Sequence, residues 1–156
     1  DPLELIEKLR TTPVSNFDLK ARLEETAPID ESMAKSLLLL YEGRVAPLST
    51  KIDLQEVQLE HVAPQTRTSI WESVIGSDYS NQVARLGNLM ILDRKINAKV
   101  KQAPFPTKVE EYKKSRLKTS ESITQAVISE WDTSVIDSRQ KWLARELSNL
   151  VELVPQ

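Results

Sequence analysis

The chain has 156 residues, a length that suits one domain with a buried core. Hydrophobic residues make up 40% and charged residues 28%, which is typical of a globular protein. The absence of cysteine excludes disulfides and thiolate metal sites, and the three glycines form no phosphate-binding loop, which excludes P-loop NTPases and kinases. No apolar run is long enough to cross a membrane, and we expect a cytoplasmic protein.

The net charge is −2, but it is distributed unevenly. Residues 1–60 hold 7 basic and 12 acidic side chains, whereas residues 85–118 hold 10 basic and 3 acidic ones. Such a block is most simply a solvated, lysine-rich surface, and it can equally bind a polyanion such as DNA. The candidates for phosphate contacts are the basic residues that flank the histidine motif described below: Arg85, Lys95, Lys99 and Lys101.

Three helices are predicted in the first fifty residues. Apolar residues share one helical face over 3–9, and a capping-box pattern at Ser15 predicts a second helix through Leu23. Asp30 can cap a third helix from Glu31 to about Val45, whose leucines we expect in the core.

The middle of the chain alternates short strands and short helices. An extended stretch that starts at Ile52 ends at Glu60-His61, and Asn88 to Leu92 forms a second strand. Helical pieces are expected over 71–75 and 79–86, with Gly87 as a left-handed residue at a helix end. Asp93 can cap a helix over 94–100.

The last third is predicted to be helical after a break at 103–106, where two prolines stand. Thr107 begins a capping box, and further helices are expected over 120–131 and 132–154. The fold class is therefore α+β, a mostly helical domain enclosing a small strand–strand–helix unit. We expect one compact domain with a helical subregion at 1–50, a core at 51–106 and C-terminal helices at 107–156.

His61 is the only histidine, and it directly follows the carboxylate of Glu60. A neutral imidazole can take a proton from water near pH 7, and carboxylate and amide oxygens, such as those of Glu60 and Asn97, suit Mg²⁺ or Mn²⁺. Successive residues of a strand point to opposite faces, so Glu60 and His61 reach one centre only if the strand bends at its end. Taken alone, such a histidine is more often a structural side chain than a catalyst.

The ordered motifs resemble the HNH (ββα-metal) nucleases, and more closely the C-terminal nuclease domain of GmrSD-type, modification-dependent restriction enzymes. The resemblance is carried by Glu60-His61-Val62-Ala63-Pro64-Gln65, Trp71, Tyr79, Leu86-Gly87-Asn88-Leu89-Met90-Ile91-Leu92 and Asn97. It continues through Phe105, Lys108, Tyr112, Ser115, Ile123, Trp131, Ile136 and Arg139, and covers about residues 50 to 147.

The resemblance implies a role for each matching residue. His61 is the general base, Glu60 and Asn97 are ligands of Mg²⁺ or Mn²⁺, and Asn88 braces the loop and orients the histidine. Gln102 stands where another asparagine is expected in this family, which is one departure from the pattern. The last motif also offers no histidine, so the metal site would be rich in oxygen ligands.

The resemblance further implies a metal-dependent DNA endonuclease of bacterial anti-phage defence. Proteins of this family usually carry an N-terminal domain that senses nucleotide and DNA modification, with an Asp-Gly-Gln-Gln-Arg motif that is missing here. We therefore expect this chain to be the C-terminal part of a longer protein. The alternatives are a DNA-binding module without activity of its own and a structural or partner-binding helical domain in which His61 only packs.

Overall fold

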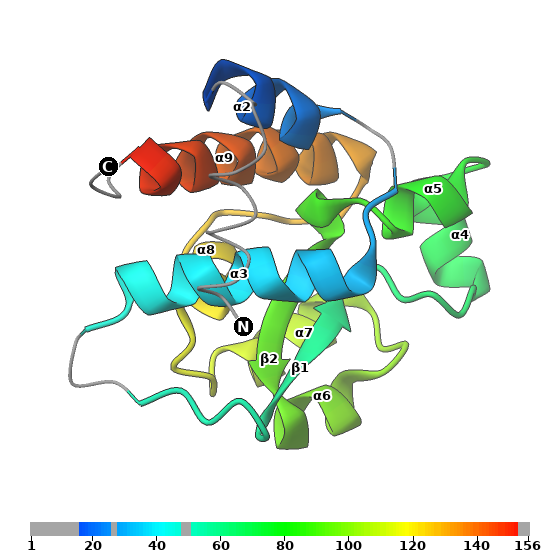
Figure 1. Ribbon diagram of the computed structural model, residues 1–156. Helices are drawn as coiled ribbons and strands as arrows, with labels where there is room; N and C mark the ends of the chain where they lie inside the picture. Colours follow the sequence, from blue (N-terminus) through cyan, green and yellow to red (C-terminus); the bar gives the residue numbers. More distant parts are fainter. Residues whose placement is uncertain (1–15, 26–27, 48–50, 153–156) are drawn as a thin grey trace.

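The computed structural model describes residues 16–25, 28–47 and 51–152. A two-stranded antiparallel sheet lies at the centre, formed by β1 (Val57–His61) and β2 (Leu89–Asp93). We call this pair of strands the hairpin, although short helices and not a tight turn connect them. Helix α3 (Glu31–Val45) crosses one face of the hairpin, and α6 (Arg94–Val100) and α7 (Phe105–Tyr112) lie toward the other (Figure 1). The expected α+β, mostly helical fold is confirmed.

The remaining elements pack around this hairpin. Helix α2 (Asn16–Glu24) lies along α9 (Thr133–Glu152), the long C-terminal helix (Figure 1). The two short helices α4 (Ser69–Ile75) and α5 (Tyr79–Val83) and the 3-10 turn η1 (Leu86–Asn88) connect the two strands. Helix α8 (Lys118–Thr124) packs against α3, α7 and β2. No helix among the described residues is long and apolar enough to span a membrane.

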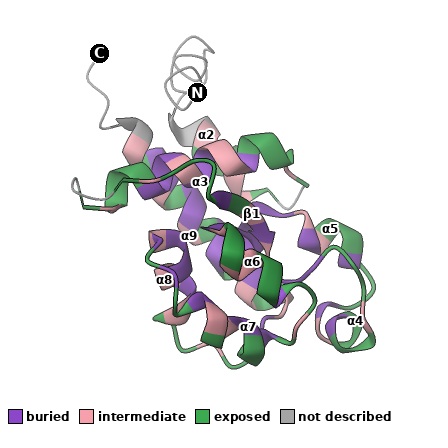
Figure 2. Ribbon diagram, turned by 90° about the horizontal axis from the view of Figure 1, so that it is seen from below, coloured by how far each residue is buried: buried purple, intermediate pink, exposed green. Residues whose placement is uncertain are grey.

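The hairpin separates two hydrophobic clusters because alternate side chains of a strand point to opposite faces. Met90 and Leu92 of β2 join the cluster that includes Trp71, Tyr112 and Trp131, whereas Leu89 and Ile91 join the leucines of α3 and α9. All four residues are fully buried, and Figure 2 shows this buried interior behind the exposed outer side of α6. The continuous apolar run of β2 is thus explained by burial on both faces.

Several predicted boundaries are confirmed by local chemistry. The Asp30 carboxylate accepts a hydrogen bond from the Met33 N–H at 2.9 Å, which caps α3 at the expected residue. The Asp132 carboxylate accepts from the Val135 N–H at 3.0 Å, at the start of α9. The helix predicted over 3–9, the Ser15 cap and the end of the last helix at Val154 lie outside the described residues.

Two predicted element boundaries were wrong. The first strand begins at Val57 and not at Ile52, because the Asp53 side chain accepts from the Gln55 N–H at 2.9 Å and holds the preceding residues in a turn. Helix α7 begins at Phe105 and not at Thr107, because Pro106 stands in the first turn, where a helix tolerates proline.

The helix predicted over 120–131 was also wrong in extent, since α8 covers only Lys118–Thr124. The carboxylate of Glu42, a fully buried residue of α3, accepts hydrogen bonds from the N–H groups of Lys118 and Thr119 at 2.7 and 3.0 Å and fixes the helix start. After α8 the chain turns and brings Trp131 into the core. These are contacts between distant segments, which local sequence cannot supply.

Gly87 was assigned the wrong role. Its φ is not positive; it lies in η1, where a Cβ atom would come within 2.2 Å of the Ile136 carbonyl oxygen of α9. Glycine is needed here for close approach of two backbones. The Gly87 N–H also donates to the Gln140 side chain, so η1 is fixed against α9 just before β2 begins.

Candidate active site

His61 is the last residue of β1, at the end of the hairpin where it pairs with Leu89. Its side chain is 13% exposed, and its Nε2 atom lies 3.6 Å from Oε1 of Glu31, in the first turn of α3. Burial lowers the pKa of the His61 imidazole, while the negative charge of Glu31 acts to raise it and the Lys108 charge to lower it. The imidazole is therefore biased toward its neutral form, which a general base requires.

Glu60 points to the opposite face of β1 and enters a closed polar network. Its Oε1 atom accepts from the Lys108 ammonium and from the Tyr112 hydroxyl, each at 2.7 Å. Lys108 also donates to the backbone carbonyl of His61 at 3.0 Å. The Lys108 side chain is fully buried and that of Glu60 is only 7% exposed. Burial raises the pKa of Glu60, and the adjacent ammonium acts in the other direction.

Asn88 braces the segment that follows His61. Its Oδ1 atom accepts from the Ala63 N–H at 2.8 Å and from the Trp131 indole N–H at 2.9 Å. Its Nδ2 atom donates to the carbonyls of Ala63 and Val83, both at 2.9 Å. Every donor and acceptor position of this buried amide is thus used by the protein. A further hydrogen bond, from the Tyr79 hydroxyl to the Pro64 carbonyl, fixes the same segment.

Asn97 lies on α6, on the side of the hairpin that Glu60 also faces. Its Nδ2 atom donates to Oε1 of Gln58 at 3.0 Å, and Gln58 precedes Glu60 by two residues on the same face of β1. This bond uses the amide nitrogen and leaves the Oδ1 atom for another partner. The structure therefore brings Asn97 to the Glu60 side of the hairpin, whereas His61 faces α3.

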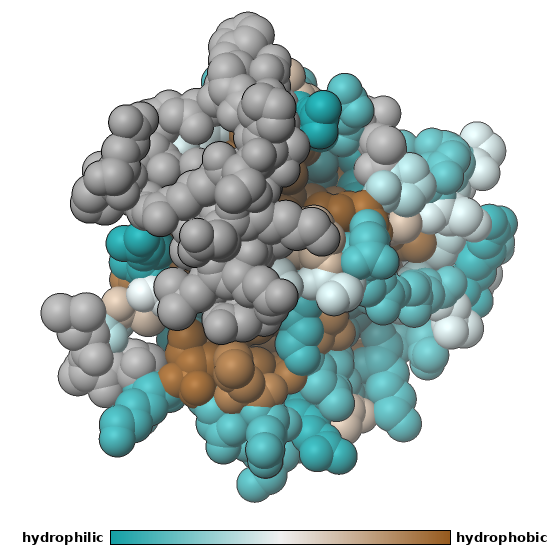
Figure 3. Space-filling view, viewed as in Figure 1, coloured by the Kyte–Doolittle hydropathy of each residue, from teal (hydrophilic) through white to brown (hydrophobic). Residues whose placement is uncertain are grey.

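The four candidates for phosphate contacts fall into two groups. Arg85 is 2% exposed, and its guanidinium is paired with Asp137 at 3.0 Å, so it is not on the open surface. Lys95, Lys99 and Lys101 are exposed on α6 and at its C-terminal end. Figure 3 shows that the lower part of the molecule, where Figure 1 places α6, is hydrophilic.

The oxygen donors near β1 fit a divalent cation only in part. Among the described residues, no three histidine, aspartate or glutamate side chains gather as a possible metal cluster, so amide oxygens would have to contribute. Both partners of Glu60 bind Oε1, which leaves Oε2 as the oxygen free of them. Lys108 already balances the charge of this carboxylate, and a metal ion there is attracted less strongly than by an unpaired one. Glu60 Oε2 and Asn97 Oδ1 are nevertheless ligand atoms of the right chemistry.

Three residues of this site had no predicted role. Lys108 and Tyr112 appeared only as members of the matching pattern, although their spacing of four residues places them on one face of α7, where both reach Glu60. Nothing in the sequence predicts a contact between Glu31 and His61, since Glu31 lies thirty residues earlier and a helix and a loop separate the two. Only the packing of α3 on the hairpin brings it close.

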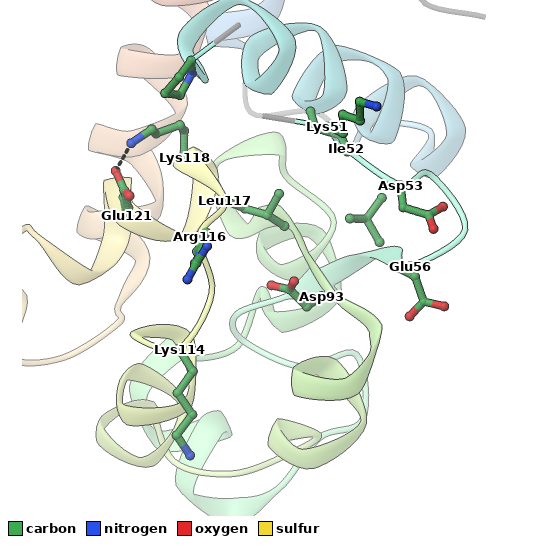
Figure 4. A pocket seen from close by; sticks show the side chains of 12 residues that line it. Lys51, Ile52, Asp53, Glu56, Asp93, Lys114, Arg116, Leu117, Lys118 and Glu121 are labelled. Atoms are coloured by element: carbon green, nitrogen blue, oxygen red, sulfur yellow. Dashed lines mark hydrogen bonds and ion pairs between the residues drawn. The ribbon is translucent and has the colours of Figure 1, made fainter. Parts of the chain in front are cut away.

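A cavity of about 860 Å³ opens at the opposite end of the hairpin, beside Val57 and Asp93 (Figure 4). Its walls carry both signs of charge, with Asp53 and Glu56 on one side and Lys114 and Arg116 on another. Lys118 in the same wall is paired with Glu121 at 2.6 Å. None of the predicted site residues lines this cavity, so it is separate from the His61 site.

The structure thus contains a strand–strand–helix unit, with a histidine at the end of the first strand and an asparagine on the helix. The family model of the C-terminal domain of GmrSD restriction endonucleases matches residues 14–146. The chain therefore belongs to this family, and membership supports a nuclease domain of the restriction-endonuclease type. Neither the curated proteins nor the solved structures compared with the chain include a significant match.

Proposed function

We propose that this chain is a metal-dependent HNH-type endonuclease domain that nicks or cleaves DNA, with His61 as the general base. The observation that carries the proposal is the position of His61, a half-buried imidazole at the hairpin end in a chain of the GmrSD restriction family. Its lowered pKa keeps the ring neutral near pH 7, ready to accept a proton. We also propose that the domain works in the cytoplasm, in a bacterial protein that restricts modified phage DNA.

In this mechanism the His61 imidazole takes the proton of the water that attacks the scissile phosphate. Asn88 holds the Ala63 segment so that the ring keeps its place at the end of β1. Glu60 Oε2 and Asn97 Oδ1 are the proposed ligands of Mg²⁺ or Mn²⁺; because both lie on the face of β1 opposite to His61, the mechanism requires the end of β1 to bend so that all three reach one centre. When bound, the cation supplies stabilisation of the negative charge that develops on the phosphate and on the leaving oxygen.

DNA is the proposed substrate, and Lys95, Lys99 and Lys101 are the proposed contacts to its backbone. These side chains are exposed on α6, the helix that also carries Asn97, so they could hold a duplex beside the metal ligands. Contacts of lysine to phosphate position DNA without reading its sequence. We therefore propose that an N-terminal sensing domain of a longer protein recognises the modified base. The core over 51–106 would perform the cleavage.

The test is a plasmid-nicking assay with the wild type and His61→Ala over a titration of Mg²⁺ or Mn²⁺. We expect metal-dependent nicking by the wild type and a loss of roughly 10²–10⁴ in rate for the variant, the usual cost of removing a general base. A matched circular dichroism spectrum of both proteins controls for folding. Undiminished nicking by His61→Ala would remove His61 from the mechanism. Salt-dependent DNA binding by the wild type without nicking would favour the alternative of a binding module.

A further inference from the structure

The carboxylate of Glu31 lies beside the only histidine of the chain. Its Oε1 atom is 3.6 Å from Nε2 of His61 and accepts a hydrogen bond from Nε2 of Gln65 at 2.7 Å. Gln65 ends the motif that begins with Glu60 and His61. One acidic side chain from α3 thus connects both ends of the segment that carries the proposed base.

The position of Glu31 is fixed by the surrounding backbone. The Asp30 cap holds the first turn of α3, and the Ile29 N–H donates to the Ala84 carbonyl at 3.0 Å. Further along α3, Leu37 and Leu38 pack in the same cluster as Leu89, the residue that pairs with His61 in the hairpin. The start of α3 is therefore held against the end of β1 by packing, by a cap and by a backbone hydrogen bond.

In the part of the chain that the structure describes, no lysine or arginine neutralises the negative charge of Glu31. Its side chain is 60% exposed, and among the described residues it forms no ion pair with a lysine or arginine. An acidic residue in the first turn of a helix is often present only because it interacts favourably with the helix dipole. That role does not explain why the carboxylate is held by Gln65 and directed toward the imidazole.

We propose that Glu31 is a positioning residue for His61, holding the imidazole ring in the orientation needed for proton transfer. The catalytic unit would then include the first turn of α3 in addition to the strand–strand–helix core over 51–106. This inference rests on the proposed nuclease function. It adds a carboxylate that acts through His61 and takes no part in binding the metal.

The contact can be tested apart from activity, because His61 gives the only histidine ring signals in an NMR spectrum of the chain. Spectra are compared for the wild type, Glu31→Gln and Glu110→Gln at one pH at which the imidazole is neutral. Glu110 is an exposed acid on α7 paired with Lys113, so its variant removes the same charge at a distant surface. We expect the ring-proton signals of His61 to move in Glu31→Gln and to stay in place in Glu110→Gln. Unmoved signals in Glu31→Gln would overturn the proposal.

The role is tested by steady-state plasmid nicking with the same proteins and Glu31→Asp. Groups that orient a reactive side chain are often worth about 10–100-fold, and at this exposed position we expect kcat of Glu31→Gln to fall about 10-fold. Its KM should stay or fall, because removal of a negative charge favours DNA binding. Glu31→Asp, which keeps the charge, should recover part of kcat, and Glu110→Gln should match the wild type.

The outcomes separate this role from the proposed function. If the wild type nicks DNA and His61→Ala does not, an unchanged or increased kcat in Glu31→Gln overturns the positioning role alone. A fall in kcat with KM unchanged or lowered, in a variant whose circular dichroism spectrum matches that of the wild type, supports it, because a loss of folded protein would change that spectrum. Absence of nicking by the wild type at every metal concentration overturns the proposed function, and this role with it.

Discussion

Glu60 and His61 are consecutive residues of β1, but their side chains lie in two different environments. Glu60 is buried between β1 and α7, where Lys108 and Tyr112 both bind one of its oxygens. His61 faces α3, where Oε1 of the exposed Glu31 carboxylate lies 3.6 Å from its Nε2 atom. One strand thus carries a closed polar network on one face and, on the other, a largely buried imidazole beside an exposed carboxylate.

The two faces differ in how firmly their side chains are held. A buried carboxylate that is held by an ammonium and a hydroxyl loses stability if either partner is removed, and it has little freedom to react. A neutral imidazole next to solvent can exchange a proton with water. The adjacency of glutamate and histidine in the sequence predicts one combined site, whereas in the structure the two side chains face different sides of β1, and Lys108 contacts both residues through the Glu60 carboxylate and the His61 carbonyl.

The largest effect on stability is expected from removal of Lys108, which breaks the polar network on the Glu60 face of β1. Lys108→Met leaves Glu60 buried without its counter-charge, and breaking a buried pair in this way typically costs about 3–5 kcal/mol of the free energy of unfolding. Chemical denaturation of the wild type and the variant measures this loss. The double variant Lys108→Met, Glu60→Gln should recover part of the stability, since no unpaired charge remains. Equal stability of Lys108→Met and the wild type would show that the network is not structural.

The stability of the other face of β1, where His61 meets α3, is expected to depend less on a single residue. Asp30→Ala removes the cap of α3 next to Glu31 and should cost about 1 kcal/mol in the free energy of unfolding. Nicking should fall more than this small loss of stability explains, because the start of α3 no longer holds Glu31 against His61. Denaturation and nicking are measured on the same preparations. Activity unchanged from the wild type would show that the start of α3 does not influence the histidine.

The pH dependence of nicking gives the finest comparison. Burial lowers the pKa of His61 below its ordinary value of 6.5, so the base stays neutral and active down to a lower pH than a free histidine would allow. Activity should fall as the pH decreases through the lowered pKa in the folded protein. Folding stability should fall in the same direction, beginning near the unfolded value, because protonation favours the unfolded chain. NMR titration of the single histidine checks the pKa directly, and a value above 6.5 contradicts the prediction.

Much of the fold could be predicted from local sequence. The boundaries of α3 follow from the Asp30 cap and the leucine pattern, and both β2 and α6 were placed to within one residue. The errors at the starts of β1 and α7 came from a local turn and a proline in the first helical turn, whereas those at Gly87 against α9 and at α8 under Glu42 occurred where a distant segment decides the local structure. A capping residue acts over three positions of the chain, whereas these contacts join residues about fifty or more positions apart.

The sequence by itself determined the family pattern, the single histidine and the basic block that contains Lys95, Lys99 and Lys101. These are properties of residue type and spacing, so they are visible before the chain folds. Only the tertiary structure decided that Arg85 is buried in an ion pair, that Lys108 and Tyr112 bind Glu60, and that Glu31 reaches His61. The physical reason is that burial and charge pairing depend on which segments pack together, and here α3 and α7 pack on opposite faces of one hairpin.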